Sequence, residues 1–247
     1  LKYNLRAPAG FFAAEAEGLG ALRAAAGDGL RVPAVLALGD ETPWIALEWL
    51  EPAPRAPGFS ERLGRGLARL HRPDGGGWGW GADNFIGPLP QPNEPAASWA
   101  EFWRARRLEP QLRRAHDVGR RPGSAREWER LFAALDGLLA PAGEDGPSLL
   151  HGDLWSGNVL ATTAGPALVD PAVYRGHREV DLAMAELFGG FDAAFHAAYA
   201  EAAPLRPGYR EARRGVYQLY PLLVHAVLFG GGYVAQAAET LRRVPAG

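Results

Sequence analysis

The sequence HGDLWSGN at residues 151–158, followed by LVD at residues 168–170, decides the fold class of this chain. Asp153 and Asn158 are separated by four residues in the first stretch, and Asp170 ends the second. At this spacing an Asp can accept the proton of an attacking hydroxyl while the Asn oxygen binds Mg²⁺. A second Asp, after the next strand, can hold the metal that bridges nucleotide phosphates. The pattern therefore predicts a metal and phosphate site.

The residues around this loop read as three short strands. Residues 148–150 lead into it, and residues 159–162 and 166–169 read as a hairpin. A hairpin of this length would return Asp170 to the side of Asn158, so that three oxygen ligands could converge on one hard cation. The alternative is that these Asp and Asn residues only shape turns, where both are common. Their joint spacing favours the metal site.

The composition excludes several classes of protein. Of the 247 residues, 47% are hydrophobic and 22% charged, which is usual for a globular enzyme. The net charge of −2 gives no electrostatic footprint for nucleic acid. The chain has no Cys, which excludes a thiolate metal site and fits the cytoplasm. We expect no membrane association, because no apolar run approaches the roughly 20 residues that span a bilayer and no signal peptide is evident.

Lys2 is the only lysine among the 26 basic residues. Arg and Lys exchange freely on a solvated surface, but not where a compact ammonium must contact phosphate. Its position at the start of a strand indicates a site that requires Lys, although a single surviving Lys could also be chance. A helix expected at residues 12–26 places Glu15 and Glu17 near its start, about a dozen residues after Lys2.

The order of the expected elements predicts an α+β protein of two parts. The Pro-rich run at residues 51–58 breaks all periodicity and separates residues 1–50 from residues 51–247. The first part should hold the helix at 12–26 and two strands, 35–38 and 44–49, with a turn at 39–41. The second part should be mainly helical, with helices opened by Ser60 and spanning 98–116, 124–140, 179–188, 191–202, 208–229 and 233–243. Ser98 and Ser124 each start a capping box, and residues 73–95 should form a packed functional loop.

The chain resembles the protein-kinase-like small-molecule kinases, which include aminoglycoside phosphotransferases and choline kinases, and within them the fructosamine-3-kinase family. Residues 151–153 and Asp170 are common to the whole superfamily. The narrower resemblance rests on Trp155 and on LKYN at 1–4, FAAEAEGLGAL at 12–22, DNFIGPLPQPN at 83–93, LYPLL at 219–223 and LFGGG at 228–232. It implies a protein-kinase-like fold with a small strand-plus-helix N-lobe and a larger helical C-lobe. The Gly-rich loop that this resemblance implies before Lys2 is not in the sequence, so we expect an N-lobe that is incomplete here, either through disorder of that loop or through truncation.

The resemblance implies ATP and Mg²⁺ as cofactors. Lys2 would contact the α- and β-phosphates and pair with Glu15, or with Glu17 within the error of helix register. The Glu48 carbonyl and the Leu50 amide would contact adenine through the backbone. For Glu15, the alternative is a solvated charge that favours the first turn of its helix.

The remaining roles concern the loop itself. Asp153 would be the catalytic base, and Asn158 and Asp170 the metal ligands. Trp155 would stack on a sugar ring, or would wedge the loop against the helical lobe. We expect Asp181 to hydrogen-bond the backbone of the loop at residues 151–158, called the metal loop below. We expect His151 to orient the same loop through its imidazole.

The function implied is ATP-dependent phosphorylation of a sugar hydroxyl on a fructosamine or related ketoamine, small or protein-linked. One alternative is an aminoglycoside or other amino-alcohol phosphotransferase, and another is a nucleotide-binding pseudokinase. Gly152 stands where protein kinases carry Arg, and Asp170 is followed by Pro-Ala instead of Phe-Gly. We therefore expect a site that is competent without phosphorylation and that accepts a small molecule.

Overall fold

A three-stranded antiparallel sheet and one long helix form the N-terminal part of the computed structural model, which describes residues 1–39 and 43–245. The central strand β3 (Trp44–Leu47) lies between β1 (Lys2–Tyr3) and β2 (Val35–Gly39), with Lys2 opposite Ile45. Helix α1 (Phe11–Ala26) contacts this sheet and buries an apolar stripe that includes Leu19 and Leu22. The turn expected at residues 39–41 falls largely outside the described residues.

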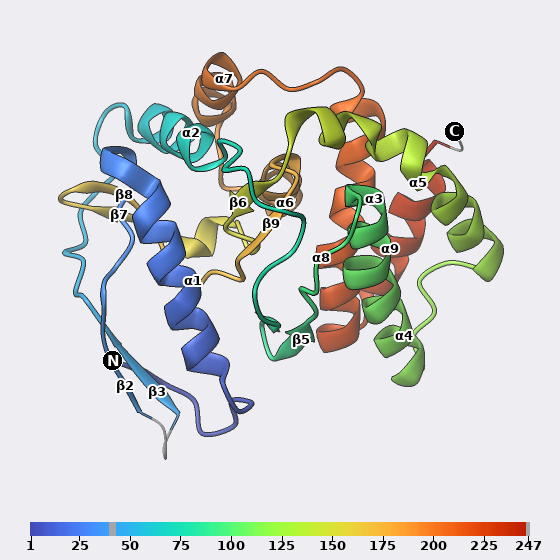
Figure 1. Cartoon of the computed structure of the whole chain (residues 1–247), viewed down its shortest axis with the longest axis horizontal. Helices are drawn as coiled ribbons and strands as arrows, with labels where there is room; N and C mark the ends of the chain where they lie inside the picture. The colour runs from blue at the N-terminus through green and yellow to red at the C-terminus, as the bar shows by residue number, and fades with distance from the viewer. Residues whose placement is uncertain (40–42, 246–247) are drawn as a thin grey trace.

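The rest of the chain is mainly helical, and its helices occupy the right and upper parts of Figure 1. They are α2 (Phe59–Leu70), α3 (Trp99–Phe102), α4 (Glu109–Asp117), α5 (Ala125–Asp145), α6 (Glu179–Phe188), α7 (Ala193–Ala202), α8 (Arg214–Phe229) and α9 (Gly232–Arg243). Helix α8 is the centre of this part, because it packs against α4, α6 and α9, while α2 packs against α7. The α+β class expected from the sequence is confirmed.

Three short antiparallel pairs lie between the helices. These are β4 (Asn84–Ile86) with β5 (Leu89–Gln91), β6 (Ser148–Leu150) with β9 (Tyr174–Gly176), and β7 (Val159–Thr162) with β8 (Gly165–Leu168). The β7–β8 hairpin is the one expected from the sequence. The Arg31 amide donates to the Pro166 carbonyl and the Ala53 amide to the Ala161 carbonyl, at 2.9 and 3.0 Å. The hairpin is therefore hydrogen-bonded to segments on both sides of the expected boundary near residue 50, and the boundary stays a prediction.

Several helix ends differ from the sequence prediction. Ser124 forms the full capping box with Glu127, as expected. The Ser98 hydroxyl accepts from the Glu101 amide, but the Glu101 carboxylate bonds the Ala97 amide instead of closing the box. Ser60 is not an N-cap, because α2 already begins one residue earlier and the Ser60 hydroxyl bonds Asp192 at 2.7 Å.

Two π-helical segments interrupt helices that we expected to be continuous. The segment Trp103–Leu108 joins α3 to α4, and the segment Tyr209–Arg213 precedes α8. Short π segments are rare and need tertiary support. Each of these two buries an arginine, Arg107 or Arg213, and Arg213 forms a paired ion bridge to Glu179 at 2.7 Å.

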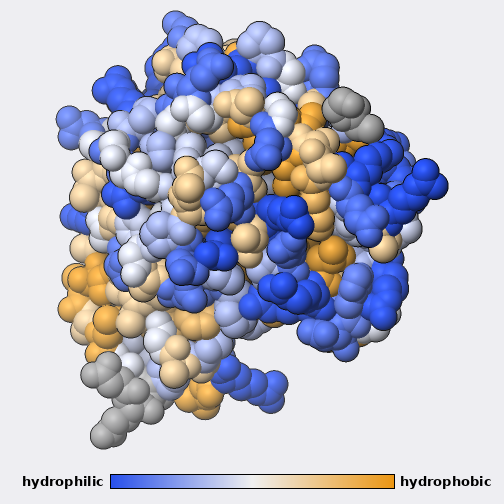
Figure 2. Space-filling model, turned by 45° about the vertical axis from the view of Figure 1, so that its right-hand side comes forward, coloured by the Kyte–Doolittle hydropathy of each residue, from blue (hydrophilic) through white to orange (hydrophobic). Residues whose placement is uncertain are grey.

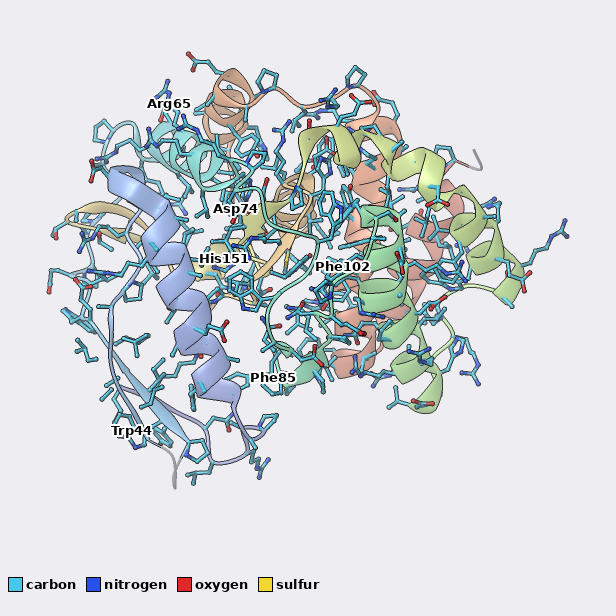
Figure 3. The ribbon with its side chains drawn as sticks, in the orientation of Figure 1. Trp44, Arg65, Asp74, Phe85, Phe102 and His151 are labelled. Carbon is cyan, nitrogen blue, oxygen red and sulfur yellow. The ribbon has the colours of Figure 1, made fainter. Side chains whose placement is uncertain are left out.

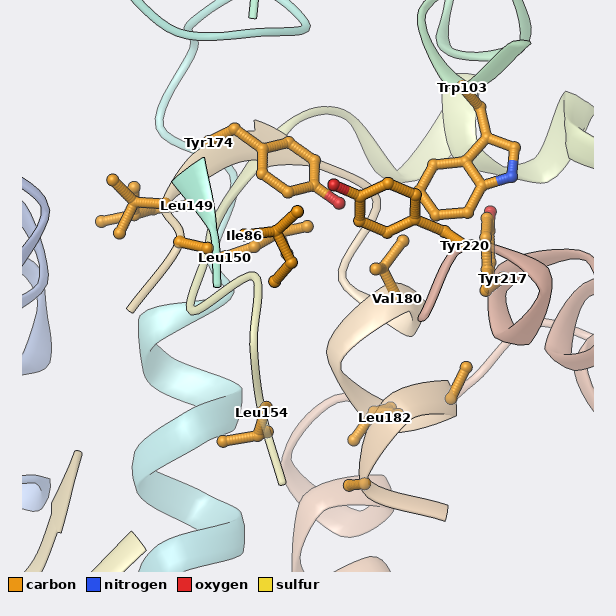
Figure 4. Close-up of a cluster of buried hydrophobic side chains, with 14 of the residues drawn as sticks. Ile86, Trp103, Leu149, Leu150, Leu154, Tyr174, Val180, Leu182, Tyr217 and Tyr220 are labelled. Atoms are coloured by element: carbon orange, nitrogen blue, oxygen red, sulfur yellow. The ribbon is translucent and has the colours of Figure 1, made fainter. Parts of the chain in front are cut away.

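The core of the helical part is rich in aromatic side chains. Figure 4 shows Trp103, Tyr217 and Tyr220 beside Tyr174, with the Tyr174 and Tyr220 hydroxyl groups toward one another. All four rings are buried. Burial raises the pKa of Tyr174 to about 12, so its hydroxyl stays neutral over the range in which proteins work.

The surface beside the N-terminal sheet is apolar. Figure 2 shows hydrophobic side chains at the lower left. The large exposed hydrophobic residues in the N-terminal part of the chain are Leu1, Tyr3, Leu5, Leu36, Leu38 and Trp49. Among the helices in the described ranges, none combines the length and the hydropathy needed to cross a bilayer.

Candidate active site

One buried carboxylate anchors the loop between β6 and β7 by accepting hydrogen bonds from its backbone. Asp181, in the first turn of α6, has no exposed surface and accepts from the His151 amide at 2.7 Å and the Gly152 amide at 2.9 Å. His71 Nε2 lies 3.1 Å from the same carboxylate. Burial alone would raise the pKa of Asp181, but the His71 hydrogen bond and charge and the loop amides outweigh it and lower the pKa. The loop-bonding role expected for Asp181 is confirmed.

His151 and Gly152 fix the path of the loop. The Asp153 amide donates to His151 Nδ1 at 3.2 Å, so Nε2 carries the proton that reaches the Val169 carbonyl at 2.9 Å. The expectation that His151 orients the loop is confirmed. Gly152 has φ 79°, and a Cβ there would lie 2.0 Å from the Ala172 carbonyl oxygen. Only glycine fits this position.

The hairpin brings Asp153, Asn158 and Asp170 together. Asn158 Nδ2 donates to the Asp153 carbonyl at 2.8 Å and its carboxylate at 3.1 Å, and lies 3.4 Å from the Asp170 carbonyl. Because its nitrogen is used in this way, the Asn158 oxygen is left to face a ligand. Burial raises the pKa of Asp153, while His151 and Asn158 act against that rise. The carboxyl is thereby shifted toward values suited to a general base.

Asp170 has a strained backbone. Its φ of 53° makes it the one non-glycine with positive φ in the described ranges, and its side chain is 47% exposed. Strained backbone conformations are frequent at functional sites, where they place a side chain in a position that a relaxed backbone would not give it. The oxygen donors of Asp170 and Asn158 are the hard ligands that Mg²⁺ prefers, and both are within reach of the same space. The residues present therefore fit the metal that the sequence implies.

Lys2 joins the N-terminal sheet to this site. Its Nζ lies 2.9 and 3.0 Å from the two oxygens of Glu15 and 3.0 Å from Asp170 Oδ1. Glu17 faces elsewhere and accepts from Trp80 Nε1 at 2.8 Å, so Glu15 is the partner. Burial alone would lower the pKa of Lys2, but the Glu15 and Asp170 carboxylates outweigh it and raise the pKa. Lys2 is therefore a firmly charged ammonium.

The segment after β3 has backbone groups available for a base. The Glu48 amide donates to the Ala34 carbonyl at 2.8 Å, and the Glu48 carboxylate accepts from Arg23, Arg31 and the Ala34 amide. Within residues 1–39 and 43–245, the Glu48 carbonyl and the Leu50 amide have no hydrogen bond. The hydrogen bond from the Ala34 amide is the main reason that the pKa of Glu48 is lowered. The adenine contacts expected here stay a prediction.

A cavity of about 270 Å³ lies between Lys2 and the carboxylates of the catalytic loop and hairpin. It is lined by Lys2, Phe11, Ala14, Glu15, Asn84, Phe85, Gly87, Asp153, Trp155, Asn158, Asp170, Pro171 and Ala172. Figure 3 places Phe85 across the lower end of α1 and His151 deeper between the two parts of the chain. Trp155 is 43% exposed, and a Cβ on Gly157 would meet its ring at 2.2 Å. The indole thus lies over its own loop with one side open to the cavity.

A buried hydrogen-bond network supports the metal loop from the β4–β5 hairpin. Asn84 Nδ2 donates to the Val173 carbonyl at 2.7 Å, and Gln91 Nε2 donates to the Ala172 carbonyl at 3.1 Å and to Asn84 Oδ1 at 2.8 Å. The Tyr220 hydroxyl donates to Gln91 Oε1 at 2.7 Å. The segment expected to be a packed functional loop therefore fixes the backbone that follows Asp170.

Arg107 completes this network without a carboxylate partner. It is fully buried in its π segment, donates to Asn93 Oδ1 at 2.7 Å and the Pro92 carbonyl at 2.6 Å, and lies 3.8 Å from the centre of the Tyr174 ring. Sequence reasoning did not single out Arg107, and it named Asn84 and Gln91 only as part of the family motif at 83–93, without a role. The signal available was the run of polar residues between apolar ones at 83–93, which reads as a loop until its partners are known.

The sequence of this chain matches known proteins over nearly its whole length. The family model described as fructosamine kinase matches residues 1–246. The chain belongs to the fructosamine kinase family. A "Probable ketoamine kinase" of Synechocystis sp. is 43% identical to this family member over 236 residues, which cover 94% of this chain and 78% of that protein.

Solved structures agree with this assignment. A crystal structure assigned as a fructosamine-3-kinase of Thermobifida fusca superposes with a TM-score of 0.84 at 40% identity, covering 96% of this chain and 81% of that one. An ADP-bound aminoglycoside phosphotransferase superposes with a TM-score of 0.54 at 12% identity, covering 94% and 81%, and shows the shared fold alone. The protein-kinase-like fold and the family resemblance are thus confirmed, and membership of a kinase family implies that ATP is the phosphoryl donor.

Proposed function

We propose that this kinase transfers the γ-phosphoryl group of ATP to a sugar hydroxyl of a fructosamine or related ketoamine. The observation that carries the proposal is the convergence of Asp153, Asn158 and Asp170 beside Lys2 in one cavity, in a chain of the fructosamine kinase family. Phosphoryl transfer through a loose transition state leaves little covalent work for the protein. Positioning and charge therefore dominate catalysis.

Each residue has a distinct task in this proposal. Asp153 aligns the acceptor hydroxyl and takes its proton as the oxygen attacks. Asn158 and Asp170 hold Mg²⁺, which when bound neutralises charge on the phosphate oxygens. Lys2, kept charged and positioned by Glu15, contacts the α- and β-phosphates.

The adenine of ATP and the sugar ring of the acceptor contact different surfaces of the site. The Glu48 carbonyl and the Leu50 amide address adenine, and their unused hydrogen-bonding groups within the described residues support this placement. Trp155 offers its half-exposed face to the sugar ring beside Asp153. Because Lys2 bonds the Asp170 carboxylate here, that contact must rearrange when the carboxylate takes a metal.

The alternatives have less support. A pseudokinase needs neither a base nor a pair of metal ligands, and the loop retains all three groups. Aminoglycoside phosphotransferases share the fold at an identity too low to indicate a shared acceptor.

The test is an ADP-release assay with glycated lysine, an aminoglycoside and choline as acceptors. We expect turnover with glycated lysine alone, dependent on added Mg²⁺, and phosphate on the sugar 3-hydroxyl. Asp153→Asn should lower turnover by about 10²–10⁴-fold while ATP binding is largely kept. Phosphorylation of the aminoglycoside alone, or activity that persists in excess chelator, would refute the assignment.

A further inference from the structure

Four aromatic side chains gather where α6, α8 and α9 meet. The His225 ring centre lies 4.7 Å from that of Phe188, 4.9 Å from Tyr233 and 5.5 Å from Phe229. Phe229 is 65% exposed, and the other three side chains are half-buried. We call these four residues the aromatic cluster. His225 lies at the edge of the core, and Phe229 beside it is open to solvent.

The aromatic cluster borders the catalytic site on two sides. After α6 the chain turns at Gly190, where a Cβ would meet the Ser156 side chain of the catalytic loop at 2.4 Å. At the other end, a Cβ on Gly87, which lines the cavity, would lie 3.7 Å from Leu228 in the last turn of α8. Figure 1 shows the lower end of α8 beside β5. The cluster is therefore continuous with the surface that surrounds Asp153.

Arg120 is already engaged, because it donates to the carbonyls of Ala226 and Val227, where it offsets the negative end of α8.

The chemistry of the cluster suits a cation that carries N–H groups. His225 Nδ1 lies 2.8 Å from the Pro221 carbonyl, which can only accept, so Nδ1 carries the proton. In the neutral ring Nε2 then keeps its lone pair and can accept a hydrogen bond. The faces of Phe229 and Tyr233 attract a cation, more strongly as it is desolvated. An exposed phenyl ring also offers apolar contact to an alkyl chain.

We propose that the aromatic cluster binds the protonated amine of the ketoamine, together with the first carbons of the chain attached to it. This inference rests on the proposed function and adds the part of the substrate that distinguishes a ketoamine from a plain ketose. The amine of a fructosamine is joined to the sugar close to the 3-hydroxyl. A hydroxyl at Asp153 therefore leaves the amine nearby, and the cluster is the cation-binding surface that continues from there.

The test compares two acceptors that differ at one atom. The first is a 1-alkylamino-fructose, which carries the protonated amine, and the second is the 1-alkoxy analogue, in which an ether oxygen replaces it. We expect Phe229→Leu and Tyr233→Leu each to raise KM for the amine about three- to tenfold, and the double variant more, with kcat nearly unchanged. KM for the ether should not change.

A matched control makes the same substitution away from the site. Phe132→Leu on α5 removes a half-buried ring that packs against Trp128, and it should leave both KM values as they are. Since Phe229 is exposed, its replacement should not unfold the protein, and a melting curve checks this. Equal effects on the amine and the ether, or no effect on either, would overturn the inference alone. If the wild-type protein phosphorylates no ketoamine, the proposed function fails together with it.

Discussion

Replacing Asp181 by Asn tests how the catalytic loop is held. The carboxylate accepts from two loop amides and His71, with no exposed surface. An amide keeps one acceptor, and its NH₂ must face a donor. The least costly orientation sets NH₂ against the Gly152 amide, which loses one hydrogen bond to a charged acceptor and leaves a buried N–H unpaired. The lost hydrogen bond to a charged acceptor is worth roughly 1.5–3 kcal/mol and the unpaired buried N–H roughly 1–3 kcal/mol. We therefore expect Asp181→Asn to cost about 3–5 kcal/mol in unfolding free energy, as breaking other buried charge pairs does.

Urea denaturation followed by fluorescence measures this loss. Asp74→Asn is the matched control, because the side chains of the Asp74–Arg175 pair are 37% and 31% exposed and pairs in contact with solvent contribute about 0–1 kcal/mol. We also expect Asp181→Asn to lower kcat, since the backbone of residues 151 and 152 loses its anchor. An unfolding free energy no lower than that of the Asp74 variant would refute the reasoning.

The pH dependence gives a second check on Asp181. Burial is the largest single influence and raises its pKa, but His71 and the loop groups together outweigh it and lower the pKa below the ordinary value of 3.8. A carboxyl with a lowered pKa stabilises the fold at every pH above its unfolded value, and this contribution is lost as the pH falls through the folded value. The stability gap between wild type and Asp181→Asn should therefore be constant near neutral pH and narrow only below about pH 3.8.

Three further predictions concern the site and its support. Lys2→Arg keeps the charge but replaces a point charge by a planar fork, and we expect a loss of about tenfold or more in kcat/KM, equal to roughly 1.4 kcal/mol; equal activity would show that the lone lysine is chance. Asp170→Ala should abolish turnover while leaving the fold intact, and Asn158→Ala should weaken the dependence on Mg²⁺ more mildly; activity of both variants at wild-type Mg²⁺ concentrations would refute the metal assignment. Tyr220→Phe leaves Gln91 Oε1 buried without its donor and should cost about 1–3 kcal/mol, which a urea titration measures and a change under 0.5 kcal/mol would contradict.

The sequence was most informative where function restricts residue type over a short distance. The β7–β8 hairpin and the loop before it are local, so spacing alone predicts that Asn158 and Asp170 meet. Asp181 was also predictable, because a carboxylate in a first helical turn has few partners other than nearby amides. By contrast, spacing could not choose between Glu15 and Glu17, since the choice depends on Trp80, which lies 63 residues away and bonds Glu17.

The sequence was least informative where long-range contacts decide the structure. Strand β9 has three residues and no periodicity, and it forms only because β6 lies beside it. The π segment at Trp103–Leu108 reads as ordinary helix until the burial of Arg107 against Tyr174 is known. Local propensity cannot supply such information.

The triad of Lys2, Glu15 and Asp170 bears on the order in which ligands arrive. With Asp153 included, carboxylates outnumber the single ammonium around the cavity, and Lys2 is already shared by two of them. These carboxylates should repel a polyphosphate that has no bound cations. They should attract the divalent cations of a polyphosphate that is already paired with them. We therefore expect the resting ion pair to favour binding of the nucleotide as a preformed complex with a divalent cation over binding of the free polyphosphate.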